Sequence, residues 1–261
     1  SVIWATEPEI YSGLDPSYTQ DGDQCVMPFA KVGSGWSPKA GVTIDDAYQR
    51  QNPPKLYVLF FTAYHIPILD GVGVEPLYGI TDEVKRLLER HKCPPKNLTI
   101  DITAAPTAPA LFHDRLGEEV VLVDSKRVAT ERAISPLDRK PARERYANRG
   151  SEMIWSIRTW LESDAIRGLR RDGGFFEAAV SQLKMRQFDD RKSQSSVETK
   201  TNYKKRMREE GQDSGSPDES DGIALCLDGI RRDHSPDVAG KNKVEDEAKD
   251  EREARETERA Q

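Results

Sequence analysis

Long hydrophobic runs are absent from this sequence. Apolar residues make up 36% of its 261 residues and charged residues 32%, and no segment approaches the roughly 18 consecutive apolar residues that cross a bilayer. No apolar segment follows a basic start in the manner of a signal peptide either. The sequence therefore excludes an integral membrane protein, and we expect no membrane partner.

Cysteine and histidine are also scarce. The three cysteines, Cys25, Cys93 and Cys226, are too widely spaced for a zinc cluster and too few for a disulfide framework. The four histidines are isolated from one another in the sequence and form no metal-binding motif. We therefore expect reduced thiols in a cytosolic protein.

The excess of acidic residues is concentrated at the end of the chain. The 39 basic and 45 acidic residues give a net charge of −6, and residues 233–261, with ten acidic and six basic residues, contribute −4 of it. The remaining −2 allows a local basic surface elsewhere. Residues 233–261 contain almost no large apolar side chains, which predicts a disordered or solvated tail after a folded domain over residues 1–232.

The pattern of apolar residues predicts an α/β fold in which a mixed sheet is flanked by helices. Alternating, β-branched or aromatic segments predict strands at residues 9–14, 24–32, 55–69, 97–100 and 119–123. Helical spacing predicts helices at residues 81–92, 108–116, 150–163, 175–186 and 217–231, the first of them capped by Thr81. We expect irregular structure at residues 33–54 and 125–147 and a polar segment at residues 189–215. The strand–helix–strand succession implies parallel crossovers after an initial hairpin.

Four aspartates stand where carboxylates can converge. Asp15 and Asp101 each follow a predicted strand, and Asp218 and Asp221 lie one turn apart at the start of the last helix. Carboxylates brought together in this way repel one another unless a cation lies between them, and Mg²⁺ or Mn²⁺ is the usual solution. The alternative is that each aspartate is only a strand-end or helix-cap residue.

The start of the last helix carries a capping pattern. Ser216 is the predicted N-cap, Pro217 the first helical residue and Glu219 the third. Asp218 lies in the first turn, where the helix dipole favours a carboxylate without any metal. Asp221 lies past that turn beside apolar residues, so a carboxylate there predicts a compensating cation.

Four segments of the sequence resemble one known family. GLDPSYTQDGDQCV (13–26), VETKTNYKKRM (197–207) and SPDESDGIAL (216–225) are similar to motifs of the nuclease domain of phage terminase large subunits. TIDITAAPTAPALFHDRL (99–116) resembles that family's strand–Asp–loop–helix element. The order and spacing of the motifs agree with the family over roughly residues 9–232.

The resemblance implies a ribonuclease-H-like fold and an endonuclease that cuts concatemeric double-stranded viral DNA with two divalent ions, Mg²⁺ or Mn²⁺. It implies that Asp15, Asp101 and Asp221 are catalytic metal ligands, with Asp218 as the alternative for the third position. Lys200 matches a family lysine that would stand near the scissile phosphate, and we expect it to be catalytic.

The basic residues near the third motif predict contacts with DNA, and the resemblance implies further protein partners. We expect Lys204, Lys205, Arg206 and Arg208 to contact the DNA backbone, since phosphate binding needs cationic side chains and no base reading. The resemblance further implies the portal, the small terminase subunit and a missing ATPase motor domain as partners, a location in the host cytoplasm, and a chain cut from a longer one.

Two other functions fit the same residues. A junction resolvase or transposase-type nuclease on the ribonuclease-H-like fold would cut branched DNA selectively. A non-catalytic module that docks on the portal would use the acidic tail and would not need Asp15, Asp101 and Asp221.

Overall fold

The computed structural model describes residues 2–17, 23–38, 42–68, 76–103, 108–134, 140–169, 174–190, 193–211 and 215–234. Its strands are β1 (Ile3–Trp4), β2 (Glu9–Leu14), β3 (Cys25–Trp36), β4 (Lys55–Ile66), β5 (Leu98–Asp101), β6 (Val121–Val123), β7 (Ile166–Arg167), β8 (Phe188–Asp189) and β9 (Ser196–Val197). Its helices are α1 (Asp46–Gln51), α2 (Pro76–His91), α3 (Pro109–Leu116), α4 (Ala142–Arg145), α5 (Arg149–Glu162), α6 (Phe175–Met185), α7 (Lys200–Glu209) and α8 (Asp218–Asp233), with a 3₁₀ turn at Pro95–Asn97 before β5.

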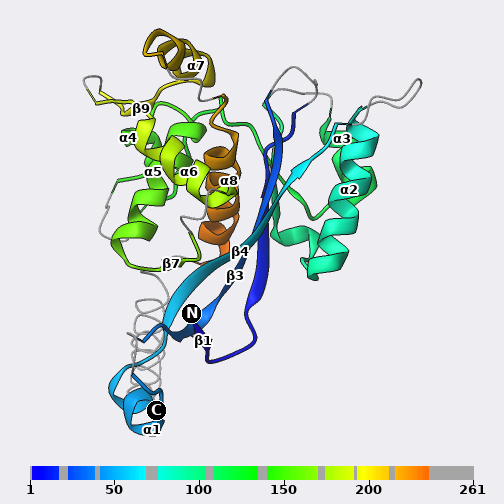
Figure 1. Cartoon of the computed structure of the whole chain (residues 1–261). Coiled ribbons are helices and arrows are strands. Elements are labelled where there is room, and N and C mark those ends of the chain that lie inside the picture. Colours follow the sequence, from blue (N-terminus) through cyan, green and yellow to red (C-terminus); the bar gives the residue numbers. More distant parts are fainter. Residues whose placement is uncertain are drawn as a thin grey trace, which may run out of the picture.

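A seven-stranded mixed sheet forms the centre of the molecule (Figure 1). The strand order is β6-β5-β2-β3-β4-β7, and β1 pairs with β3 outside that path. Strands β2, β3 and β4 are antiparallel neighbours, whereas β5 runs parallel to both β2 and β6, and β7 runs parallel to β4. The predicted mixed sheet is therefore confirmed. Its parallel pairs include β2 with β5 and β5 with β6, the strands for which the strand–helix–strand succession predicted parallel crossovers.

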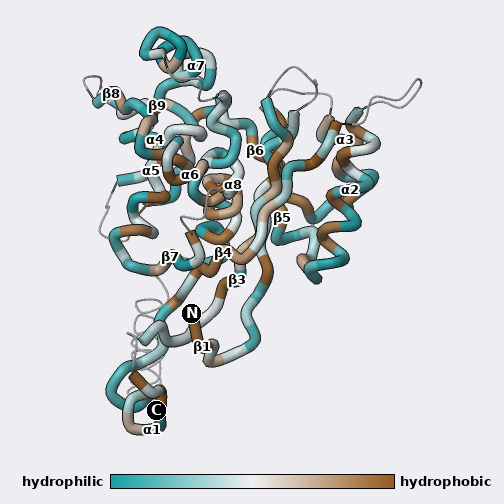
Figure 2. The backbone as a smooth tube through the Cα atoms, in the orientation of Figure 1, coloured by the Kyte–Doolittle hydropathy of each residue, from teal (hydrophilic) through white to brown (hydrophobic). Residues whose placement is uncertain are grey.

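Helices cover both faces of the sheet (Figure 1). On one face Leu87 of α2 and Phe112 of α3 pack in one core with Phe29 of β3. On the other face Trp160 of α5 and Ile223 of α8 belong to a second core, which includes residues of α6. The brown segments of Figure 2 follow the sheet and the inner sides of these helices, while α7 is largely hydrophilic. The sheet thus separates two hydrophobic cores.

Several element boundaries differ from the predictions. Helix α2 begins at Pro76, so Thr81 is not its N-cap. It lies buried inside the helix, where its hydroxyl donates to the Tyr78 carbonyl. Helix α8 begins one residue later than predicted, with Pro217 at the cap and no side-chain cap hydrogen bond. The Ser216 hydroxyl instead donates to the Asp218 carboxylate at 2.7 Å, so the predicted capping box does not form.

The segments expected to be irregular, and the polar segment, contain short regular elements. Strand β3 continues to Trp36 and α1 follows within residues 33–54, α4 lies within residues 125–147, and β9 and α7 lie within residues 189–215. Residues 235–261 of the predicted tail lie outside the described residues. In the part of the chain that the structure describes, no helix is long and apolar enough to span a bilayer, and the three cysteines are buried and free, as predicted.

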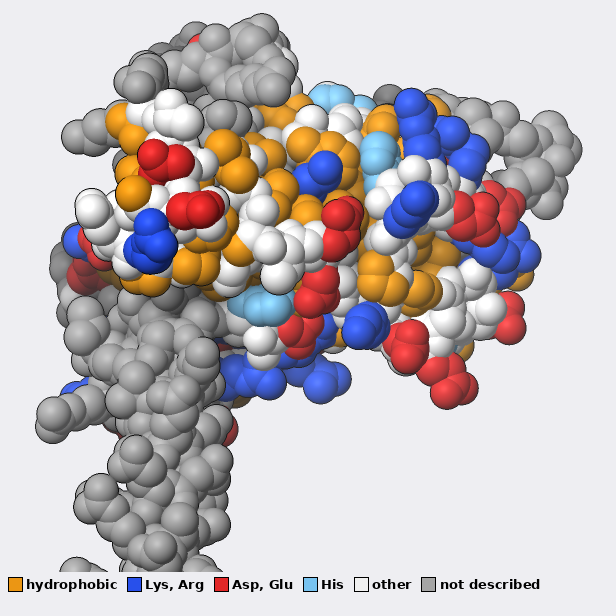
Figure 3. All heavy atoms as spheres, turned by 90° about the horizontal axis from the view of Figure 1, so that it is seen from below, with side chains coloured by type: hydrophobic (Ala, Val, Ile, Leu, Met, Phe, Trp, Pro, Cys, Tyr) orange, Lys and Arg blue, Asp and Glu red, His pale blue; other side chains and the backbone are white. Residues whose placement is uncertain are grey.

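The aspartates singled out in the sequence lie toward one end of the molecule. Helix α7 and the N-terminal end of α8 lie at the upper end in Figure 1. The opposite end, seen in Figure 3, shows basic, acidic and hydrophobic side chains interspersed. The aspartates singled out in the sequence lie toward the α7 end, because it is there that β2 and β5 end and α8 begins.

Candidate active site

Two aspartates meet at the carboxyl ends of neighbouring parallel strands. Strands β2 and β5 pair in parallel with Leu14 opposite Ile100, so Asp15 and Asp101, one residue further along, lie at the same edge of the sheet. The backbone of Asp15 is fixed by two hydrogen bonds with Val26 of β3, each 3.1 Å long. The predicted convergence of these two strand ends is confirmed.

Two glycines allow α8 to bring further aspartates to this edge. A Cβ atom on Gly13 would lie 2.4 Å from the Cys226 nitrogen and 2.5 Å from the Gly222 oxygen, both backbone atoms of α8. A Cβ on Gly222 would lie 3.0 Å from Pro28. The helix can therefore lie directly on β2 only because Gly13 has no side chain, and this close approach carries the start of α8 to the end of the strand.

Lys200 occupies the centre of the converging carboxylates. Its ammonium lies 2.7 Å from Asp15 Oδ2, 2.9 Å from Asp218 Oδ1 and 3.3 Å from Asp221 Oδ2. Lys200 is the first residue of α7, whose N-cap Thr199 accepts a hydrogen bond from a backbone amide of the first turn. A lysine ammonium of the chain itself therefore lies between these carboxylates.

Asp218 and Asp221 have different surroundings. Asp218 is 1% exposed and accepts hydrogen bonds from the Gln24 amide at 2.6 Å, from the Ser216 hydroxyl and from Lys200. It ties the start of β3, the start of α8 and Lys200 together. Asp221 lines a cavity of about 330 Å³ and pairs at 2.5 Å with Arg186, whose side chain is 5% exposed.

Asp101 is held by the loop that follows β5. Its Oδ1 accepts hydrogen bonds from the Thr103 amide at 2.8 Å and from the Thr103 hydroxyl. The same hydroxyl contacts Ser125 at 2.7 Å, so the loop after β6 supports this arrangement. Asp101 lines the same cavity as Asp15 and Asp221.

Burial dominates the electrostatics of the site. Burial raises the pKa of Asp15 to about 8, with Lys200 opposing and the Asp221 and Asp218 carboxylates adding to the increase. Burial also raises the pKa of Asp101 and that of Asp218. Burial lowers the pKa of Lys200, but the carboxylates around it outweigh that effect and hold the pKa above its ordinary value. The surrounding carboxylates therefore favour the protonated form of the lysine.

The chemistry of the cavity suits a hard divalent cation, but the present arrangement contains the ammonium in its place. Carboxylate oxygens such as those of Asp15, Asp101 and Asp221 are the ligands that Mg²⁺ and Mn²⁺ prefer. Across the described residues, no group of three His, Cys, Asp or Glu side chains is arranged to hold a metal ion. An ion held by Asp15 and Asp221 would share their oxygens with the Lys200 ammonium, which lies 2.7 and 3.3 Å from them.

The basic residues of α7 divide into paired and exposed ones. Lys204 pairs with Asp23, and Arg206 pairs with Glu198 at 2.6 Å. Lys205 is 75% exposed, with only a 3.9 Å contact to Glu209, and Arg208 is exposed. Tyr203 of the same helix is fully buried. Lys205 and Arg208 are thus the more accessible of the four.

Comparisons with solved structures identify the fold. The nuclease domain of the large terminase subunit gp2 of bacterial virus Sf6 matches with a TM-score of 0.53 and 13% sequence identity, over 86% of this chain and 90% of that one. Variants of that domain with one lysine replaced by alanine match similarly, one with calcium at a TM-score of 0.53 and one with manganese at 0.52. No protein-family model and no curated protein matches the sequence.

The chain has the fold of a terminase nuclease domain. The predicted ribonuclease-H-like class is thereby confirmed for the sheet and its flanking helices. In this terminase-nuclease fold the structure brings Asp15, Asp218 and Asp221 around Lys200 and places Asp101 on the same cavity.

Sequence reasoning missed some residues of this candidate site. Arg186, which pairs with Asp221, lies at the end of a helix predicted only from its apolar spacing, and nothing in the sequence marks its partner. The segment GLDP (13–16) already pointed to Gly13, because a glycine stands there two residues before the strand-end aspartate. Only the fold shows why a glycine is required there: Gly13 lies in contact with α8.

Proposed function

We propose that this chain is a metal-dependent endonuclease that cuts double-stranded concatemeric viral DNA during genome packaging. The observation that carries the proposal is the convergence of Asp15 and Asp221 on the ammonium of Lys200, with Asp101 lining the same cavity. Burial of several like charges costs free energy that a purely structural role does not repay. Such arrangements cluster at functional sites.

The residues that would hold the ions are Asp15, Asp101 and Asp221, all of which line the cavity. Asp218 is less suited, because it is removed from the cavity lining and its carboxylate already accepts three hydrogen bonds. The similar terminase domain of virus Sf6 was solved with calcium and with manganese, which supports a divalent ion here. When bound, two such ions supply an activated water and stabilise the leaving oxygen of a phosphodiester.

The residues of the chain have separate roles in this proposal. Asp101 is oriented by Thr103, and Asp221 by Arg186, so their oxygens face the cavity in fixed positions. Lys200 neutralises the carboxylates of the metal-free protein. Because Lys200 lines the same cavity, its ammonium would be in reach of a non-bridging phosphate oxygen of a bound strand.

DNA would approach over the exposed basic residues. Lys205 and Arg208 on α7 and Lys126 at the rim of the cavity are exposed. Contacts of such side chains with phosphates bind DNA without reading its sequence. Lys204 and Arg206 would have to leave their carboxylate partners to do the same.

The choice of DNA substrate tests this proposal. Supercoiled plasmid, linear duplex and a four-way junction are incubated separately with the protein and Mn²⁺. We expect plasmid and linear duplex to be cut with little dependence on branching. Selective cleavage of the junction would replace the proposal with a resolvase, and no cleavage of any substrate would favour a docking module.

A further inference from the structure

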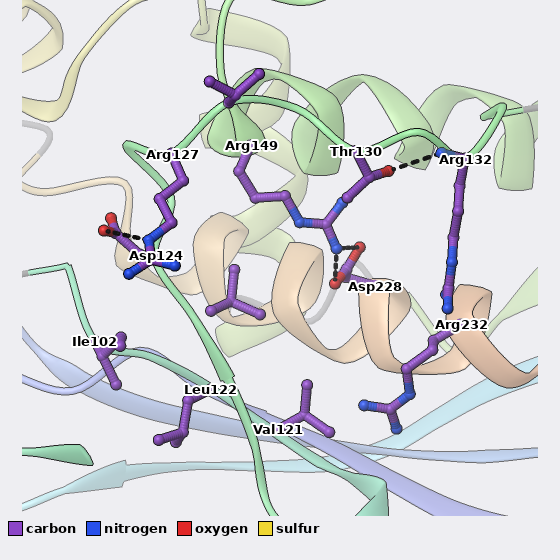
Figure 4. A pocket seen from close by; sticks show the side chains of 12 residues that line it. Ile102, Val121, Leu122, Asp124, Arg127, Thr130, Arg132, Arg149, Asp228 and Arg232 are labelled. Carbon is purple, nitrogen blue, oxygen red and sulfur yellow. Dashed lines mark hydrogen bonds and ion pairs between the residues drawn. The ribbon is translucent and has the colours of Figure 1, made fainter. Parts of the chain in front are cut away.

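A second cavity lies beside the carboxylate site and has no part in the function proposed above. Its volume is about 430 Å³, within the range of small-molecule pockets. Edge strand β6 contributes Val121 and Leu122 to its floor, and the exposed side chain of Val128 lies at its margin. Figure 4 shows the apolar side chains of β6 below and arginine side chains around them.

The cavity has an excess of positive charge. Four arginines and two aspartates line it. Two of the arginines are paired with those aspartates: Arg149 contacts Asp228 at 2.5 Å, and Arg127 lies 3.5 Å from Asp124. Among the lining residues the remaining arginines are Arg132 and Arg232, and Arg232 has its carboxylate partner, Asp233, outside the lining.

Arg132 and Arg232 form the anion-attracting part of the cavity. Arg132 extends from its loop toward Arg232 of α8 (Figure 4). The guanidinium of Arg232 donates to the Lys96 carbonyl at 2.9 Å and lies 3.2 Å from Asp233. Arg132 makes no side-chain ion pair with any residue that the structure describes. Arg232 keeps Asp233 as a partner outside the cavity lining, so Arg132 is the guanidinium that a phosphate would engage first, and the planar fork of arginine suits phosphate.

The cavity shares its walls with the carboxylate site. Lys126 and Asn148 line the carboxylate cavity, whereas their sequence neighbours Arg127 and Arg149 line the second one. The loop after β6 and the start of α5 therefore separate the two cavities by the thickness of a single chain segment. A DNA strand at the carboxylates has the second cavity as its neighbour.

We propose that the second cavity binds one nucleotide of a single DNA strand, with its phosphate at Arg132 and Arg232 and its base on Val121, Leu122 and Val128. The strand as the source of the nucleotide rests on the proposed nuclease function. An intact duplex does not fit, because paired bases cannot enter a pocket of this size. The occupant is an unpaired nucleotide, as at a frayed or cut end.

Fluorescence anisotropy in EDTA tests this proposal without any cleavage. The native chain is titrated against labelled oligo(dT) and against a blunt duplex over a range of salt concentrations. We expect Arg132→Ala to weaken oligo(dT) binding about tenfold and to reduce the salt slope by about 0.7 for one lost phosphate contact. Val128→Asp should weaken it in the same direction, Arg132→Lys should retain part of the affinity, and blunt-duplex binding should change less than about twofold.

Arg158→Ala is the matched control, because Arg158 is exposed on α5, pairs with Glu162 of the same helix and lines neither cavity. Equal losses in Arg158→Ala and Arg132→Ala, or no loss in Arg132→Ala, would overturn the proposal. So would displacement of oligo(dT) by micromolar free dTMP or ATP, which would make this a free-nucleotide site, or by an acidic peptide. A chain that binds oligo(dT) in this way but cuts no DNA would refute only the nuclease function.

Discussion

At the residue scale, Lys200 has a structural importance that its polar sequence surroundings do not suggest. The sequence alone predicts an exposed lysine with little effect on stability. In the structure its side chain is only 30% exposed and its ammonium is shared by three carboxylates. Removal of this ammonium would leave Asp15, Asp218 and Asp221 without their common counter-ion.

We therefore expect Lys200→Ala to destabilise the metal-free protein by about 1–3 kcal/mol, and Mn²⁺ to restore most of the loss because it can take the vacated position. Thermal unfolding in EDTA and in millimolar Mn²⁺ measures both effects. Lys205→Ala, which removes an exposed lysine of the same helix, should change the melting temperature little. A metal-free Lys200→Ala protein as stable as the native one would contradict the central position of the ammonium.

We expect substitution of Asp221 to affect mainly cleavage and substitution of Asp218 to affect mainly stability. Asp221→Asn should abolish cleavage, because this carboxylate faces the cavity, and should lower stability modestly, because Arg186 loses its charged partner. Asp218→Asn should retain measurable cleavage but lose about 1–3 kcal/mol, since its buried carboxylate accepts three hydrogen bonds. Paired melting curves and plasmid assays test this, and the reverse assignment of the two effects would move the metal site to Asp218.

At the scale of elements, the position of α8 on β2 depends on one glycine. The Cβ atom of Gly13→Ala would lie 2.4 and 2.5 Å from backbone atoms of α8, which cannot move as a flexible side chain can. We expect a loss of about 3 kcal/mol together with a loss of cleavage, because α8 would move away from the end of β2.

Gly79→Ala in α2 is the matched control for this substitution. A Cβ at Gly79 meets nothing within 4 Å, and alanine favours a helix interior by about 1 kcal/mol over glycine. Unfolding by urea compares the two variants. If Gly13→Ala is as stable as Gly79→Ala, the close packing of α8 on β2 is wrong.

The sequence predicted the elements whose stability comes from a regular apolar pattern. Strand β2 and helices α3, α5 and α6 lie within one or two residues of their predicted bounds, because each has a clear buried face. Asp15 and Asp101 could be placed together because two parallel strands end at one edge of a sheet.

Helix α7 was not predicted, because only Tyr203 and Met207 of its ten residues are buried. Its position depends on contacts with distant parts of the chain, such as those of Lys200 with Asp15 and of Lys204 with Asp23. The Arg186–Asp221 pair was missed for the same reason, since 35 residues separate the partners in the sequence. Ion pairs between residues far apart in the chain leave no periodic pattern in a single sequence, so the sequence could not predict them.

At the scale of the whole molecule, the folded body is expected to be complete at the end of α8. Asp233 accepts a hydrogen bond from Tyr11 at 3.1 Å, so the last turn of α8 is tied to β2. We expect a chain that ends at His234 to unfold within about 0.5 kcal/mol of the full chain and to retain metal-dependent cleavage. Calorimetric melting of both chains tests the predicted division near residue 232, and a markedly lower melting temperature for the shorter chain would contradict it.

The loss of supercoiled plasmid in Mn²⁺ and in EDTA, followed for the native chain and for Asp15→Asn, tests the metal-dependent nuclease most directly. Asp164→Asn is the matched control, because this exposed aspartate lies at a positive φ that asparagine tolerates and outside both cavities. We predict that the native chain and Asp164→Asn cut plasmid in Mn²⁺ and not in EDTA, and that Asp15→Asn cuts at least about a hundredfold more slowly. Cleavage that persists in EDTA, or an undiminished rate in Asp15→Asn, would contradict the assignment of this site.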